Sequence, residues 1–356
     1  MPLVRDFFRK MFSRFPMDDR AGIEFVQSVA DDFGVSPQHM RDDRLHIEEL
    51  LTLLDCHASW HSGEKDESRR TTSFPEVIGA LAARDSLSYM MAGLLFDAQR
   101  AAFECQTPLH HQLAQRLDLG DTIISYNYDL VVEYALATAQ RFSPANYHVP
   151  FFGQIEGADF GYSDIEAFDP SDAAGIDLLK LHGSLNWLHR KHEYLSRGRK
   201  TSELPLGETL YLVDAFQVFI PPGSSGKVFS LLDVPNEDDD PADPEFIDLV
   251  PVIVAPTFEK SIVWAGFNGV LRSLWQRAHA ALAASTHLAI IGYSLRDADF
   301  QSMWLFRTAL AQSRSERAIW VVNPSEPDRT RLSSILGDYG KVYVAETFAE
   351  YLARTA

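Results

Sequence analysis

Cysteine is nearly absent from this sequence, because its 356 residues include only Cys56 and Cys105. Two thiols cannot supply the four thiolates of a zinc ribbon, and they do not form the disulfide framework of a small secreted domain. We therefore expect a cytoplasmic protein without zinc. Cys56, His57 and His61 allow a metal site on one predicted helix, but no carboxylate or further ligand accompanies them at motif spacing, which favours an ordinary helix surface.

Basic residues are also scarce. The 32 Lys and Arg side chains stand against 50 Asp and Glu side chains, which gives a formal net charge of -18. An extended interface with the phosphates of a nucleic acid is disfavoured at this charge, so we expect no direct nucleic-acid binding. The basic residues of 190–200 are typical of a solvated loop. The acidic segment 236–245 lacks the spacing of a calcium loop and has the composition of an exposed tip.

Long apolar runs are missing as well. No segment reaches the length needed to cross a bilayer, and the N-terminus lacks the hydrophobic core of a signal peptide. We expect no association with a membrane. The start of the chain, residues 5–15, is basic and amphipathic, which is compatible with a membrane or targeting helix. However, a stripe that faces a core is the simpler explanation, because large apolar side chains recur at helical spacing at Phe8, Met11, Phe12 and Phe15.

The sequence is 46% hydrophobic, which is enough for one substantial core and an inserted subdomain. Residues 16–118 have helical patterns: apolar side chains repeat along 47–54, and a capping box with an early proline at 73–76 opens a second helix. From about residue 119, short β-rich runs alternate with helices or loops, which predicts an α/β fold with a mostly parallel sheet. The predicted strands are 121–126, 178–182, 251–255, 287–291, 318–322 and 341–344. The connections 141–176 and 189–250 have little periodicity and are predicted to be long loops.

Two of these strands end in side chains suited to catalysis. His182 lies where the apolar strand 178–182 enters a turn at Gly183, and a histidine at such a strand end can act as a general base near neutral pH. The alternative is a buried histidine that bonds a neighbouring strand. Asn127 ends the strand 121–126, and Asp129 lies at the N-terminus of the next helix, where its carboxylate can cap.

A third strand, 287–291, ends on Gly292, which allows a ligand to approach the backbone. Ser294 and Asp297 then have the spacing of a capping box at the start of a helix. The N-termini of such helices bind phosphates or ribose hydroxyls.

Together, four motifs resemble the sirtuin-like NAD-consuming proteins of bacterial antiphage defence. They are Ser-Tyr-Asn-Tyr-Asp at 125–129, Lys-Leu-His-Gly-Ser at 180–184, Ala-Pro-Thr-Phe-Glu-Lys at 255–260 and Gly-Tyr-Ser-Leu-Arg-Asp-Ala-Asp at 292–299. The motifs occur in the order found in that family and cover about residues 120–325. The acidic, largely helical segment before them also has a counterpart in the family.

The resemblance implies a Rossmann-like parallel sheet with a large N-terminal helical insertion. Residues 1–15 would be the first helix of the core, 16–118 the insertion, and 119–356 the core itself. The implied activity is that of an NAD glycohydrolase, an NAD+ nucleosidase that releases nicotinamide and ADP-ribose and depletes NAD in abortive infection. The resemblance also implies a homo-oligomer and a possible partner ATPase or short Argonaute. Protein deacylation is disfavoured, since the protein-deacylating sirtuins that the resemblance also includes usually carry a four-cysteine zinc module.

The resemblance also implies site residues. Asn127 and His182 match the family's catalytic pair: the Asn orients water or the nicotinamide ribose, and the His acts as a base. The residues that match positions around the NAD, which is the substrate, are Asp129, Gly183, Gly292, Ser294 and Asn323.

The chain departs from the family at its start. Members begin with a strand and a Gly-Ala-Gly-x-Ser-like turn that cradles the diphosphate, whereas the residues after Met1 resemble the segment on the C-terminal side of that turn. The first strand and the Gly-rich turn are thus expected to be absent, either because the start codon is assigned too late or because the protein is truncated. The second explanation implies an alternative function, a catalytically impaired nucleotide-sensing or scaffold subunit of a defence complex.

Overall fold

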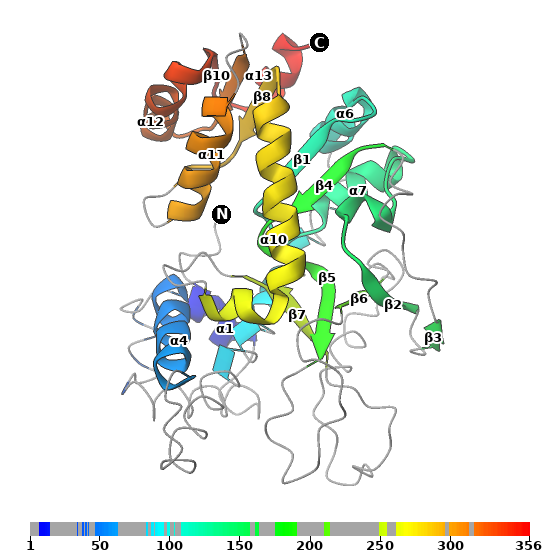
Figure 1. Ribbon diagram of the computed structural model, residues 1–356, viewed down its shortest axis with the longest axis vertical. Coiled ribbons are helices and arrows are strands. Elements are labelled where there is room, and N and C mark those ends of the chain that lie inside the picture. Colours follow the sequence, from blue (N-terminus) through cyan, green and yellow to red (C-terminus); the bar gives the residue numbers. More distant parts are fainter. Residues whose placement is uncertain are drawn as a thin grey trace, which may run out of the picture.

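The computed structural model describes residues 108–156, 161–163, 175–190, 210–213, 249–254, 261–295, 299–312 and 317–356 of the main α/β part. In the N-terminal part it describes 7–14, 47–62, 90–95 and single or paired positions between 34 and 103. The described residues form a mixed α/β structure with small parallel sheets (Figure 1).

Two of the three sheets in the described part of the chain are purely parallel. The first pairs β1 with β4, and the second has the order β10-β9-β8. Their bounds are Thr122–Ser125 for β1, Asp177–Lys180 for β4, His287–Ile291 for β8, Ala318–Val322 for β9 and Lys341–Ala345 for β10. These five strands confirm the predicted strands to within three residues at each end.

The third sheet is mixed and was not predicted. Its order is β3-β2-β6-β5-β7, with bounds Gly161–Ser163, Phe151–Glu156, Leu210–Val213, Gly183–Arg190 and Leu249–Ile253. Strand β7 was predicted in the parallel sheet, but it pairs antiparallel with β5. The prediction of structureless connections at 141–176 and 189–250 was also wrong in part, because β2, β3, β6 and the end of β5 come from them.

Helices cover these sheets and connect their strands. They are α1 (Phe7–Arg14), α4 (Ile47–Ser62), α6 (Pro108–Arg116), α7 (Val131–Thr138), α10 (Ser261–Ala284), α11 (Phe300–Gln312), α12 (Glu326–Leu336) and α13 (Phe348–Arg354), with 3-10 turns η2 at Pro144–Tyr147 and η4 at Gly337–Tyr339. Figure 1 shows the long α10 lying between β8 on one side and β1 with β4 on the other.

One hydrophobic core joins the two parallel sheets through α10. Leu274, Ala278 and Leu282 of α10 are buried in the same cluster as Leu178 of β4 and Ile319 of β9. Burial of such side chains stabilises a fold by about 1.5–3 kcal/mol each. The helix therefore holds together two sheets whose strands are not paired with each other in the described part of the chain.

A second core contains the N-terminal helices. Phe8 and Met11 of α1 are buried, which confirms the predicted core-facing stripe, and so are Leu50 and Leu54 of α4. Tyr128, Leu130 and Leu185 belong to the same cluster, so these helices pack against the segment after β1. The predicted capping box at 73–76 lies outside the described residues.

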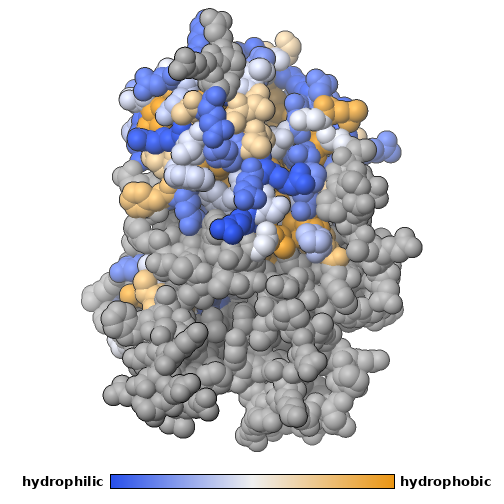
Figure 2. Space-filling view, in the orientation of Figure 1, coloured by the Kyte–Doolittle hydropathy of each residue, from blue (hydrophilic) through white to orange (hydrophobic). Residues whose placement is uncertain are grey.

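The described surface on the face shown in Figure 2 is mixed in character. Figure 2 shows the described part of one face as a mosaic of hydrophilic and hydrophobic side chains. In the described part of the chain, no helix is both long enough and apolar enough to span a membrane.

Two glycines with positive φ provide a test of the packing between the β4–β5 turn and β7. Gly183 has φ 86°, and a Cβ added there would lie 2.1 Å from the carbonyl oxygen of Val252 in β7. Gly292 has φ 68°, but a Cβ there would meet no atom within 4 Å. We expect Gly292→Ala to cost about 1–2 kcal/mol from backbone strain alone, and Gly183→Ala to cost a further 1–3 kcal/mol or so from overpacking.

Urea unfolding of the two variants measures this difference. Equal losses of stability in Gly183→Ala and Gly292→Ala would contradict the close approach of Val252 to the turn.

Candidate active site

The register of β1 and β4 places the two predicted catalytic residues just beyond the ends of adjacent strands. Ser125 pairs with Lys180, and the Leu181 N–H donates a hydrogen bond to the Ser125 carbonyl oxygen at 3.0 Å. Asn127 and His182 each come two residues after this last pair. They therefore lie at the same level, at the carboxyl ends of neighbouring parallel strands, which is where open α/β sheets keep their ligand sites.

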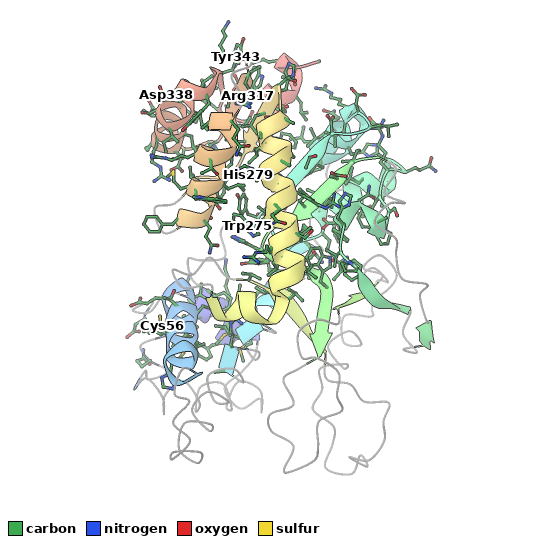
Figure 3. The ribbon with its side chains drawn as sticks, viewed as in Figure 1. Cys56, Trp275, His279, Arg317, Asp338 and Tyr343 are labelled. Carbon is green, nitrogen blue, oxygen red and sulfur yellow. The ribbon has the colours of Figure 1, made fainter. Side chains whose placement is uncertain are left out.

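His182 lies within a cluster of aromatic rings and is only 4% exposed. Its ring centroid is 5.1 Å from that of Tyr126, in an edge-on arrangement, and 6.4 Å from those of Tyr128 and Trp275. Trp275 comes from the middle of α10 (Figure 3) and donates its indole N–H to the Leu181 carbonyl oxygen at 3.2 Å. The Val254 N–H, one residue after β7, donates a hydrogen bond to the His182 carbonyl oxygen at 2.8 Å.

Asn127, in contrast, is exposed to solvent. The residues on both sides of it, Tyr126 and Tyr128, contact the His182 ring. Tyr128 is fixed by two hydrogen bonds: its hydroxyl donates to the Val254 carbonyl at 2.8 Å, and its own carbonyl accepts from the Leu185 N–H at 3.0 Å. The loop that carries Asn127 is thus anchored to the elements that surround His182.

A stacked pair of tyrosines links this region to the end of β8. The Tyr126 and Tyr293 rings are 4.6 Å apart and nearly parallel, with 2° between their planes. Tyr293 lies between Gly292 and Ser294, so the structure brings the two predicted groups of site residues together at this stack. Burial raises the pKa of both tyrosines, and their hydroxyls stay protonated at neutral pH.

The helix after β8 begins later than predicted. Its first residue is Phe300, and the Oδ1 of Asp299 accepts a hydrogen bond from the Ser302 N–H at 3.2 Å, so Asp299 caps it. The predicted cap at Ser294 was therefore wrong, and Asp297 lies outside the described residues. The other Asp299 oxygen accepts from the Tyr293 hydroxyl at 2.6 Å, which ties the helix start to the stack.

The remaining predicted ligand residues have local structural roles. Asn323 is 5% exposed, and its side chain bonds the Ser325 N–H at 2.9 Å and the Tyr293 carbonyl at 3.4 Å. Asp129 lies one residue before the N-cap of α7, Leu130, and its Oδ1 accepts from the Val131 N–H at 3.2 Å. The approach of Val252 to Gly183 accounts for that glycine without a ligand.

A buried polar network lies beside the two catalytic candidates. The Lys180 ammonium is 3.0 Å from the Glu133 carboxylate, and both side chains are 1% exposed. The Tyr147 hydroxyl donates to Glu133 at 3.0 Å and accepts from the Asn186 amide at 3.1 Å. Burial raises the pKa of Glu133, while the Lys180 ammonium acts in the opposite direction.

Sequence reasoning assigned no role to Tyr126, Tyr293, Trp275 or Lys180. Tyr126, Tyr293 and Lys180 lie within the motifs that define the resemblance. A lysine inside an otherwise apolar strand was the available signal for the buried network, since a buried ammonium needs a partner. Trp275 lies in a helix without a motif, and nothing in the local pattern distinguishes it from an ordinary core residue.

Two comparisons with known proteins were without a match. A scan against models of known protein families found no match. A search of curated proteins found no significant match.

Among the residues that the structure describes, no group of three His, Cys, Asp or Glu side chains could hold a metal ion. Cys56 is exposed on α4 (Figure 3).

The packing of Tyr126 against His182 predicts that this ring protects the imidazole. Replacing Tyr126 by Ala should accelerate the reaction of His182 with diethyl pyrocarbonate several-fold, because the edge-on ring is removed. Tyr126→Phe, the matched control, keeps the ring and should react at the wild-type rate. Mass spectrometry of the peptide that contains His182 measures both rates, and equal rates in Tyr126→Ala and the wild type would contradict the protection.

Proposed function

We propose that this protein is a sirtuin-like NAD glycohydrolase that cleaves NAD to nicotinamide and ADP-ribose in antiphage defence. The observation that carries the proposal is the position of Asn127 and His182 at one level of neighbouring parallel strands. An exposed amide beside a buried imidazole suits a substrate that binds from solvent and reacts where bulk water is excluded.

The proposed reaction breaks the bond between nicotinamide and C1′ of its ribose. Water attacks C1′, nicotinamide leaves with the bonding electron pair, and the water loses a proton as ADP-ribose forms. Positive charge develops on the ribose in the transition state, so the site must orient the ribose and accept a proton. In the proposed mechanism, Asn127 orients the water or the ribose, and His182 takes a proton from the water or a ribose hydroxyl.

The proposal extends to the other residues of the NAD site and to a Rossmann-like fold. The two small parallel sheets would form the two halves of a Rossmann-like sheet, with 16–118 as the helical insertion, and the shared burial around α10 supports this. Gly292, Ser294 and Asn323 would lie beside the adenosine half. The open space at Gly292 supports a close approach of the backbone to a ligand.

The proposed role in the cell and the proposed partners rest on the resemblance to sirtuin-like defence proteins alone. The protein would deplete NAD on infection as a homo-oligomer, with a partner ATPase or short Argonaute as its possible trigger. A second candidate is a nucleotide-sensing or scaffold subunit without activity. The burial of His182 under Tyr126 supports that candidate, since in this arrangement the imidazole is closed off from solvent.

Release of nicotinamide from NAD distinguishes the two candidates. Asn127→Ala and His182→Ala should each lower turnover by at least roughly a hundredfold, the usual contribution of a positioned acid-base group. His287→Ala is the matched control, because His287 is exposed at the amino end of β8, away from the strand ends that carry the site. It should keep the wild-type rate.

Chromatography of the products gives the rates. Undiminished hydrolysis in both site variants would remove Asn127 and His182 from the mechanism. NAD binding by the wild type without release of nicotinamide would favour the nucleotide-sensing subunit.

A further inference from the structure

The buried network around Lys180 is connected to both catalytic candidates through the chain. Lys180 precedes His182 by two residues on the same segment, and its ammonium donates a hydrogen bond to the Asp129 carbonyl at 2.5 Å. Asp129 comes two residues after Asn127. One side chain thus joins the strand end that carries His182 to the turn that carries Asn127.

The same network also holds the chain after His182. Ser184 donates to the Asn186 side-chain oxygen at 2.7 Å, and Asn186 bonds the Tyr147 hydroxyl, which in turn bonds Glu133. Hydrogen bonds therefore fix the segment two residues before His182 and two and four residues after it. All of these side chains are almost completely buried.

A buried ion pair of this kind is a poor source of stability. Removing two charges from water costs nearly as much as their attraction returns, and replacing both partners by apolar side chains is often neutral or stabilising. Removing only one partner is destabilising, because it leaves an uncompensated charge. The specific role of this pair must be sought in the geometry that it imposes.

We propose that Lys180 is a positioning residue that sets Asn127 and His182 relative to each other through its hydrogen bond to the Asp129 carbonyl, with Glu133 as the buried counter-charge that offsets the cost of burying the ammonium. This inference rests on the proposed NAD hydrolysis for its kinetic consequence. Its structural consequence, a fixed turn at 127–131, is independent of any activity.

Two variants separate positioning from stability. Lys180→Met combined with Glu133→Leu removes both charges together with the bond to Asp129. We expect its melting temperature to stay near that of the wild type, while kcat falls about ten- to hundredfold, as a misplaced catalytic group causes. Glu133→Gln leaves Lys180 and its bond to Asp129 but no counter-charge. Its melting temperature should fall by several degrees, while kcat measured well below that temperature stays near the wild-type value.

Hydrogen–deuterium exchange of the amides at 127–131 gives a readout that needs no NAD. Exchange should be faster in the double variant and unchanged in Glu133→Gln. If the wild type does not cleave NAD, the proposed function fails, but the exchange rates still test whether the bond from Lys180 to the Asp129 carbonyl fixes the turn. Unchanged exchange in the double variant would overturn the inference. So would faster exchange with an unchanged kcat, or a kcat that tracks melting temperature in both variants.

Discussion

The parallel register of β1 and β4 is the constraint on which the site depends. Because Ser125 pairs with Lys180, the chain leaves both strands at the same edge, and Asn127 and His182 each follow two residues later. A slip by one residue would move every side chain of a strand to the opposite face of the sheet. The register is held by burial of Leu178 and Leu179, whose side chains point to opposite faces of β4, and by the polar bonds of Lys180. Packing thus determines which groups can meet a substrate.

The aromatic rings around His182 give the site a closed character. Tyr126 contacts the imidazole of His182 edge-on and stacks on Tyr293, which follows the carboxyl end of β8. This stack therefore lies between the proposed catalytic residues and the residues proposed to bind the adenosine half of NAD. A nucleotide that extends across both groups must displace or pass this stack. Aromatic pairs contribute about 0.5–1.5 kcal/mol beyond their buried area, which is small enough for the binding of a ligand to overcome. The stack can therefore shield the His182 imidazole from water and still yield to a nucleotide that binds.

The sequence predicted strands best where apolar runs are short and end in a clear turn. The parallel strands β1, β4, β8, β9 and β10 obey this rule, as does the buried stripe of α1. The sequence reasoning failed for the mixed sheet, where β2 pairs with the distant β6 and β3 is only three residues long. The cap of α11 was also missed: Ser294 and Asp299 are both good capping residues, and the hydrogen bonds that Asp299 accepts from Tyr293 and Ser302 decide between them. Lys180 shows the same limit, since its partner Glu133 comes from a different element.

The central claim is that the strand ends of β1, β4 and β8 form a single site for NAD. Hydrogen–deuterium exchange of His182→Ala with and without NAD tests it most directly, because a variant with slowed turnover keeps the substrate intact during the measurement. The account predicts slower exchange on addition of NAD in both 125–129 and 292–295, on the two sides of the Tyr126–Tyr293 stack. Protection of only one of these segments, or of neither, would contradict a single site that spans them.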